Sequence, residues 1–195
     1  MLRGWVMRTF ICIGVASTMV MALAVSTLMA QGTGPSLVEF KSAEHGFSLL
    51  YLSSWKPEEH PADAPKTLVL RLRPIDAPAD KPSAVVIVMV TPAKASGEAP
   101  TFDDVQAAVV DFAVKGNAPD AKPVVSTEVT LGGQKARRVI MAGTDKRYDA
   151  PMKAVVLVTV HNGKGFALAL AAPNEDFDRV RKGFDTLTQS FKFGT

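Results

Sequence analysis

A long uncharged run near the start of the chain sets the first limit on what this protein can fold into. Thr9 to Ala30 contains no charged residue, and the residues before it carry Arg3 and Arg8 without any acid. A basic start, an apolar centre and small residues at the end are typical of a secretory signal. The run is also long enough, at roughly 20 residues, to cross a bilayer as a helix. We therefore expect residues 1–30 to form a signal peptide or an N-terminal membrane anchor.

Two fates of this segment fit the sequence. Cleavage after Ala24 follows the small-x-small pattern, and cleavage after Ala30, which we favour, coincides with the start of polar sequence. If the segment is retained, residues 9–30 anchor the protein in the inner membrane. Both fates place the rest of the chain outside the cytoplasm, in the periplasm or secreted, and the positive charges before the run favour the same orientation. Residues 31–36 are then a short flexible lead to the folded domain, residues 37–195.

Charge and cysteine content exclude several classes of function for that domain. Without Arg3 and Arg8 the chain has 20 basic and 19 acidic residues. A domain so close to neutral has no overall field that would attract nucleic acid. Cys12 is the only cysteine, so the domain has no disulfide, no thiolate nucleophile and no cysteine-based metal site.

Strand patterns occupy most of the domain. Leu68, Leu70 and Leu72 alternate with their neighbours as in a half-buried strand, whereas residues 84–90 are apolar throughout, as in a central strand covered on both faces. Gly132-Gly133 is a typical two-residue hairpin turn. The predicted strands span residues 37–41, 45–52, 67–73, 84–90, 122–131, 134–142, 151–161 and 166–172.

Two further segments, residues 101–115 and 174–190, have helical periodicity with one apolar face each. Thr101 and Asn174 are placed to cap them. Gly183, inside the second helix, indicates that a neighbour presses close to the backbone there. Two amphipathic helices and a set of hairpins predict an α+β domain, in which a mainly antiparallel β-sheet is flanked by helices on both faces as an α/β/α sandwich.

The order of elements and several residues resemble the PsbP-like and DcrB-like family of extracytoplasmic proteins, over residues 37–193. The resemblance rests on Gly46-Phe47-Ser48, Tyr51, Trp55, residues 177–184 and Ser190-Phe191. Leu52 departs from the pattern, because the family often has proline at that place. The resemblance implies an α/β/α sandwich and a protein that is usually not an enzyme and that binds, stabilises or helps assemble membrane proteins. It assigns no functional residue to this chain.

Side chains that could carry chemistry are few. His45, His60 and His161 are expected to be exposed, and catalysis would require one of them to meet an acid and a nucleophile. Glu58, Glu59, His60 and Asp63 come closest to a metal cluster, but they lie in a proline-rich loop and read as solvated charge. We therefore predict no catalytic residue, no metal site and no cofactor.

Two other groups have two interpretations each. The first group is basic and consists of Arg71, Arg73, Lys135, Arg137 and Arg138. These residues either form a patch that binds carboxylate or phosphate, or protect exposed edge strands from pairing, and we favour edge protection. Residues 146–149 read as a mobile loop tip. Tyr51 and Trp55 either line a ligand groove or anchor the core, and we favour the core.

The leading functional hypothesis is a non-catalytic extracytoplasmic protein that binds a membrane or envelope protein through a sheet edge or loops. The first alternative is a small-molecule or lipid binder, with a cavity between the alanine-lined strand 166–172 and the last helix. The second is a hydrolase that uses His45 or His60.

Overall fold

The computed structural model describes residues 36–194 with the exception of 59, 61–63 and 79. The predicted leader, residues 1–30, and residues 31–35 of the lead lie outside this range. Ser36, the last residue of the predicted lead, is tied to the domain, because its hydroxyl donates to Ser53 Oγ at 2.8 Å and its carbonyl accepts from Ser53 N–H at 2.8 Å. Within the described residues, no helix combines the length and the apolarity that a membrane span requires.

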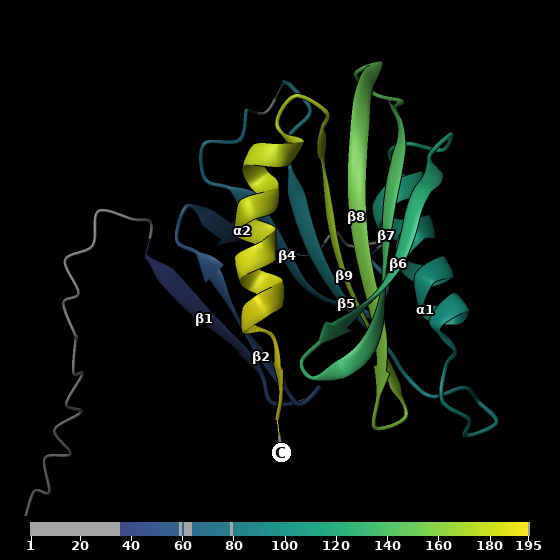
Figure 1. Ribbon diagram of the computed structural model, residues 1–195. Coiled ribbons are helices and arrows are strands. Elements are labelled where there is room, and N and C mark those ends of the chain that lie inside the picture. Colours follow the sequence, from purple (N-terminus) through teal and green to yellow (C-terminus); the bar gives the residue numbers. More distant parts are fainter. Residues whose placement is uncertain (1–35, 59, 61–63, 79, 195) are drawn as a thin grey trace, which may run out of the picture. The chain divides into compact units, whose positions relative to one another are not determined.

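The larger sheet has seven antiparallel strands in the order β3-β4-β5-β9-β8-β7-β6 (Figure 1). Consecutive strands pair directly at the hairpins β6–β7, β7–β8 and β8–β9. The strands are β3 (Trp55–Pro57), β4 (Leu68–Pro74), β5 (Val85–Thr91), β6 (Lys122–Leu131), β7 (Gln134–Asp145), β8 (Ala150–His161) and β9 (Lys164–Pro173).

A second, three-stranded antiparallel sheet joins the two ends of the domain. Its central strand β2 (Phe47–Leu52) lies between β1 (Leu37–Ser42) and β10 (Lys192–Phe193). The sequence predicted neither β3 nor β10, which have only three and two residues and no strand pattern of their own. It also did not predict that the strands divide into two sheets. The mainly antiparallel α+β fold with two helices is confirmed.

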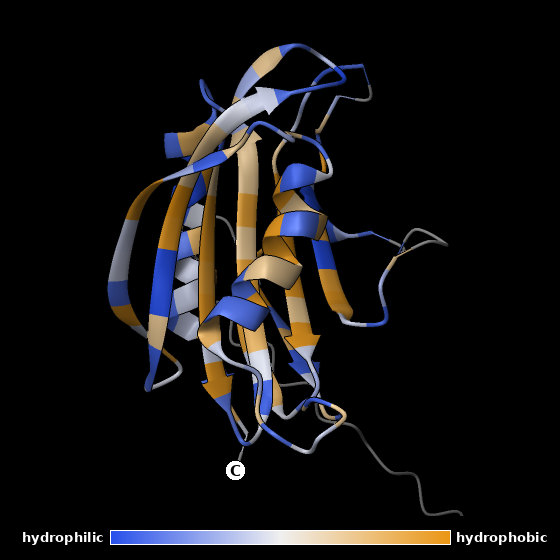
Figure 2. Ribbon diagram, turned by 90° about the vertical axis from the view of Figure 1, so that its right-hand side faces the viewer, coloured by the Kyte–Doolittle hydropathy of each residue, from blue (hydrophilic) through white to orange (hydrophobic). Residues whose placement is uncertain are grey.

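The alternation along β9 divides the core into two clusters. Phe166, Leu168 and Leu170 belong to the cluster that contains the buried face of α2 (Phe177–Ser190). The alanines between them belong to the cluster that contains the buried face of α1 (Phe102–Val109). Figure 2 views the molecule from the side of α1, where hydrophobic strands lie behind the helix. Since neighbouring residues of a strand point to opposite faces, each helix packs on its own set of side chains.

The first helix begins as the sequence predicted. Thr101 accepts a hydrogen bond from Asp104 N–H at 3.2 Å, and the Asp104 carboxylate accepts from Thr101 N–H at 2.8 Å, which completes a capping box. These bonds and Lys94 Nζ, 2.8 Å away, lower the pKa of Asp104 from 3.8 to about 2, with the lysine as the largest cause. Beyond Val109 the helix continues as a π-helical segment, η1 (Val110–Lys115).

The second helix begins later than predicted. Asp176, not Asn174, is the residue before its first turn, and no side chain caps it there. Asn174 N–H instead donates to Pro151 O at 2.9 Å, which ties the end of β9 to the start of β8. The close approach predicted at Gly183 is confirmed: a Cβ atom on this residue would lie 2.9 Å from Leu52 Cδ1 and 3.6 Å from Trp55 Nε1.

Candidate binding surfaces

The three histidines lie on different parts of the fold. His60 is exposed, but His45 is only 21% exposed in the β1–β2 turn, and His161 is half-buried against Phe193, so the expectation of three exposed histidines is wrong for two of them. No side-chain hydrogen bond among the described residues involves a histidine.

Glu58 has a structural partner in place of a metal. Its carboxylate lies 3.0 Å from Arg71 Nε and 3.5 Å from Arg73 Nη1, so it is shared between two guanidinium groups of β4. Glu59 and Asp63 lie outside the described residues. Within the part of the chain that is described, no group of three histidine, cysteine or carboxylate side chains is close enough to hold a metal ion.

The structure separates the residues of the predicted basic patch. Arg71 and Arg73 lie on β4, and the other three lie on β7, with β5, β9 and β8 between the two strands. Neither β4 nor β7 is an edge strand, so the interpretation as edge protection is wrong as well. Arg137 instead forms an ion pair with Asp103 of α1 and lies 5.7 Å from the centre of the Phe102 ring.

Arg71 and Arg73 meet a different group of charged residues. The turn after β7 is held by Asp145, whose Oδ1 accepts from the N–H groups of Arg147 at 2.8 Å and Tyr148 at 3.1 Å. This turn brings both residues to a cavity that the two β4 arginines also line. The sequence predicts a loop tip at residues 146–149, and the signal for an Asx turn there is Asp145, two residues before Arg147.

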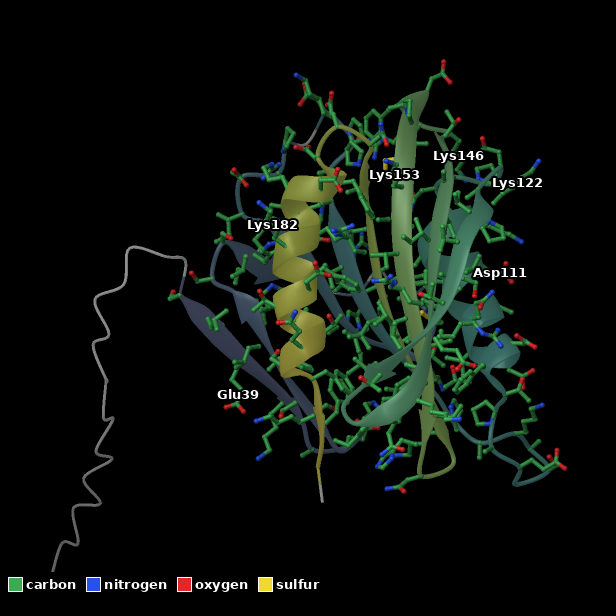
Figure 3. All side chains as sticks on the ribbon, viewed as in Figure 1. Glu39, Asp111, Lys122, Lys146, Lys153 and Lys182 are labelled. Atoms are coloured by element: carbon green, nitrogen blue, oxygen red, sulfur yellow. The ribbon has the colours of Figure 1, made fainter. Side chains whose placement is uncertain are left out.

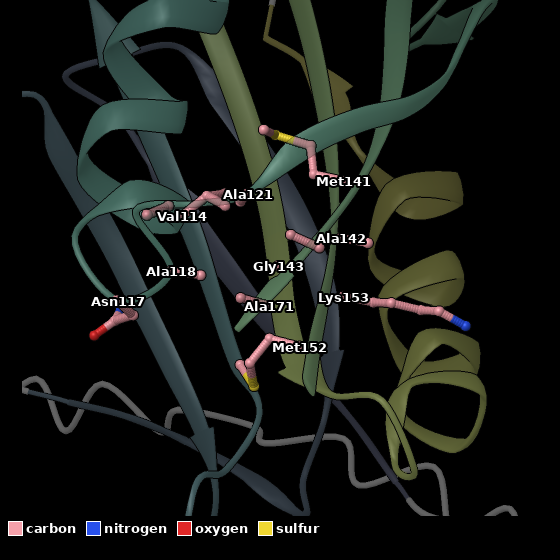
Figure 4. A pocket seen from close by; sticks show the side chains of 12 residues that line it. Val114, Asn117, Ala118, Ala121, Met141, Ala142, Gly143, Met152, Lys153 and Ala171 are labelled. Atoms are coloured by element: carbon pink, nitrogen blue, oxygen red, sulfur yellow. The ribbon is translucent and has the colours of Figure 1, made fainter. Parts of the chain in front are cut away.

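The side chains proposed for a ligand groove are part of the core. Tyr51 is 9% exposed and Trp55 is 8% exposed, which agrees with the interpretation as core anchors. The space predicted for a lipid is filled, because the side chains of β9 that face α2 are almost fully buried and the alanines face α1 instead. A hollow between η1 and the sheet has a volume of only about 10 Å³, room for about one water molecule (Figure 4).

The longest accessible edge of the large sheet is β6. It pairs only with β7, and most of its residues are exposed. Val124 and Val125 are 65% and 42% exposed, and a bulge separates Pro123 from Val125 in the register with β7. Figure 3 shows Lys122 at the start of this strand. Lysine, proline and a bulge are features that protect an edge strand from unwanted pairing. In β6 these features occur only in the first residues of the strand.

The remainder of β6 has no such protection. From Val125 to Leu131 the strand pairs with β7 in an uninterrupted register, and it contains one charged residue, Glu128. Within residues 36–194 as described, its outer backbone groups have no partner strand, since β6 is the last strand of the sheet. At the other end of the sheet, β3 has three residues and ends in Pro57. The two edges therefore differ in their capacity to accept a further strand.

Several solved structures share this fold at low sequence identity. The solution structure of cyanobacterial PsbP (CyanoP) from Synechocystis sp. PCC 6803 has a TM-score of 0.60 and 19% identity, over 83% of this chain and 95% of that chain. The Ran-binding protein Mog1p of Saccharomyces cerevisiae has a TM-score of 0.52 and 8% identity, over 82% and 96%. LpqN of Mycobacterium tuberculosis, which is involved in cell envelope biogenesis, has a TM-score of 0.50 and 16% identity, over 85% and 88%.

Sequence comparison identifies the family. No curated protein matches the chain at a significant level. The family model of PsbP matches residues 35–193, which is nearly the whole of the domain whose strands, helices and binding surfaces are described above. The chain therefore belongs to the PsbP family.

Proposed function

We propose that this protein is a non-catalytic, extracytoplasmic member of the PsbP family that binds an envelope or membrane protein through the edge strand β6. The observation that carries the proposal is the regular, accessible stretch of β6 from Val125 to Leu131, which begins at the exposed pair Val124 and Val125. An extended segment of a partner can add to such an edge as a further strand. Main-chain hydrogen bonds then supply affinity, and side chains at alternate positions supply specificity.

Three further points support the proposal. The uncharged run at residues 9–30 favours export, with or without retention in the membrane. Mog1p, which shares the fold, is a Ran-binding protein, and LpqN is involved in cell envelope biogenesis. The two core clusters, one with each helix, are consistent with an α/β/α sandwich whose faces are both occupied, which leaves the edge and the loops for a partner.

The proposal can be tested with two variants matched in chemistry. Val124→Lys with Val125→Lys places two charges at the edge of β6, where they oppose the docking of another strand. Ile75→Lys, at a residue that is 58% exposed near the end of β4, introduces the same kind of charge away from that edge. The tagged full-length chain and both variants are produced in the native cells, and proteins that co-purify from the membranes are quantified.

The proposal expects a membrane protein that co-purifies with the wild type and with Ile75→Lys but is reduced at least tenfold with the β6 variant. Equal recovery with all three proteins would refute binding through β6. N-terminal sequencing of the same samples tests the predicted export, which requires either a new N-terminus after Ala24 or Ala30, or an intact chain in the membrane fraction. An intact chain in the cytosol would contradict it.

A further inference from the structure

The cavity lined by Arg71 and Arg73 has the composition of an anion site. It has a volume of about 130 Å³, and its charged and polar lining comes from β4, the β4–β5 loop, the segment after η1, and the end of β7 with the turn that follows it. Its charged and polar lining consists of Arg71, Arg73, Lys81, Ser83, Asn117, Asp145, Arg147 and Tyr148. Four cations thus converge on one cavity of a domain that is otherwise close to neutral.

The carboxylates present do not balance these cations. Asp145 is 6% exposed, and its Oδ1 is occupied by two backbone N–H groups of the turn. Glu58 contacts both Arg71 and Arg73 from outside the lining. Among the described residues, two carboxylates against four cations leave a formal excess of two positive charges. Lys81 also lines a neighbouring hollow with Asp76 and Asp176, but no ion pair joins it to either carboxylate.

The arginines also have donors to spare. Arg73 Nη2 donates to Ser83 Oγ, but the Nε–H groups of both β4 arginines are buried and make no hydrogen bond within the described residues. The distance of 3.0 Å between Arg71 Nε and Glu58 Oε2 lacks hydrogen-bond geometry. A guanidinium group has five N–H donors, so one shared carboxylate and one hydroxyl leave most of them free.

The rest of the cavity suits an anion that is partly desolvated. Val85, Met152 and Ala171 supply apolar lining, and an apolar surface beside the charges strengthens the attraction between them. Lys146 N–H donates to Asn117 O at 2.8 Å, which fixes the β7–β8 turn against the segment after η1. Arg147 lies 5.1 Å from the centre of the Tyr148 ring, which restricts its side chain beside the cavity.

We infer that this cavity binds a doubly charged phosphate group, such as that of a small soluble phosphomonoester. The charge of the dianion matches the excess of two positive charges, and its oxygens accept the free donors of Arg71, Arg73, Lys81 and Arg147. The site does not coincide with the β6 edge, because none of the residues that line the cavity lies on β6. Loss of partner binding would therefore leave this inference standing.

The test uses the full chain in phosphatidylcholine nanodiscs and glycerol 3-phosphate as the probe, with binding measured by calorimetry and by the amide signals of Arg147 and Tyr148. Arg147→Gln and Lys81→Gln each remove one charge from exposed side chains of the lining, and we expect each to weaken binding about tenfold. Arg138→Gln, an exposed arginine of β7 that does not line the cavity, is the matched control and is expected to bind as the wild type does.

Affinity is also expected to rise between pH 5 and pH 7, because the second pKa of a phosphomonoester is about 6 and the cavity lining contains no histidine. Nanodiscs that contain phosphatidic acid distinguish the two sources of the phosphate group. If the site accepts a lipid headgroup, the phosphatidic acid competes with glycerol 3-phosphate; if the site accepts only soluble ligands, it does not compete. No binding by the wild type, or equal weakening by Arg138→Gln, would overturn the inference.

Discussion

The imidazole ring of His161 stacks on the ring of Phe193, with centroids 4.1 Å apart and planes inclined by 23°. This contact joins the β8–β9 hairpin of the large sheet to the last strand of the small sheet. Phe193 also packs edge-to-face on Phe166 at 4.9 Å and on Phe191 at 5.1 Å. A Cβ atom on Gly132 of the β6–β7 turn would lie 2.9 Å from the Phe193 ring. One side chain thus meets three separate parts of the large sheet and Phe191, the residue that follows α2.

Truncation of this side chain tests how strongly it couples the two sheets. We expect Phe193→Ala to lower the free energy of unfolding by about 2 kcal/mol, because a half-buried aromatic ring loses its apolar contacts and its stacking partner. Urea denaturation followed by fluorescence measures the change. Lys192→Ala, an exposed neighbour on the same strand, should alter the stability by no more than about 0.5 kcal/mol.

The contact between β9 and α1 depends on the absence of a side chain at Gly165. A Cβ atom there would lie 2.1 Å from Val105 Cγ2 and 3.1 Å from Pro100 Cγ. We expect Gly165→Ala to destabilise the domain by about 1–3 kcal/mol through overpacking. Val105→Ala removes the clashing methyl groups, so the double variant should be more stable than the sum of the two single effects indicates.

Additive effects in that cycle would show that the strand and the helix do not press on each other.

Gly183→Ala is a useful comparison, because its nearest neighbour is the flexible end of Leu52. There the gain in helix propensity, about 1 kcal/mol, offsets a small displacement. We expect a change close to zero or slightly stabilising, measured in the same denaturation series.

The capping box of α1 contributes to the stability of the domain by an amount that depends on pH. The pKa of Asp104 is about 2 in the folded protein against an ordinary 3.8, because Lys94 and the Thr101 groups favour the carboxylate. A lowered pKa means stabilisation that is complete above about pH 4 and is lost as the pH falls toward 2. The stability difference between wild type and Asp104→Asn, from denaturation at several pH values, should shrink over that range.

Thr101→Ala removes the other half of the box. We expect it to cost about 1 kcal/mol at neutral pH, measured by the same denaturation method. If the difference between wild type and Asp104→Asn were constant from pH 5 to pH 2, the ionised carboxylate would have no part in the cap.

Replacement of Glu58 should affect stability and anion binding in opposite directions. Glu58→Gln leaves Arg71 and Arg73 without their shared charge, and we expect a loss of about 1–2 kcal/mol in the free energy of unfolding. The same change removes a negative charge beside the proposed phosphate site, so glycerol 3-phosphate should bind several-fold more tightly. Denaturation and calorimetry on one preparation measure both effects, and weaker binding would contradict the proposed location of the site.

Local patterns predicted the parts of the fold that depend on neighbouring residues. The alternation of Leu68, Leu70 and Leu72 defined a strand, Gly132-Gly133 defined a hairpin, and Thr101 defined the start of a helix. Each of these signals lies within a few residues of the feature that it determines. The resemblance to the PsbP family, which the family model confirms, had the same basis in short groups of residues.

The errors came from contacts between distant segments. β10 is a strand because it meets β2, roughly 140 residues earlier, and two residues carry no strand pattern of their own. Asn174 is a residue type that often caps helices, but here its N–H donates to the carbonyl of Pro151. Arg71 and Arg147 gave no hint in the sequence that they line one cavity, because their proximity results from the order of strands in the sheet and from the turn that Asp145 holds.

The position of β2 between β1 and β10 also has a consequence for how the chain reaches its native state. Phe47 stacks on Phe191 at 5.2 Å, so an early strand completes its packing only when the last residues of the domain are available. Such a high contact order slows folding into the range of milliseconds to seconds. A chain that is exported before it folds would therefore stay able to pass through a translocation pore until its final residues have crossed.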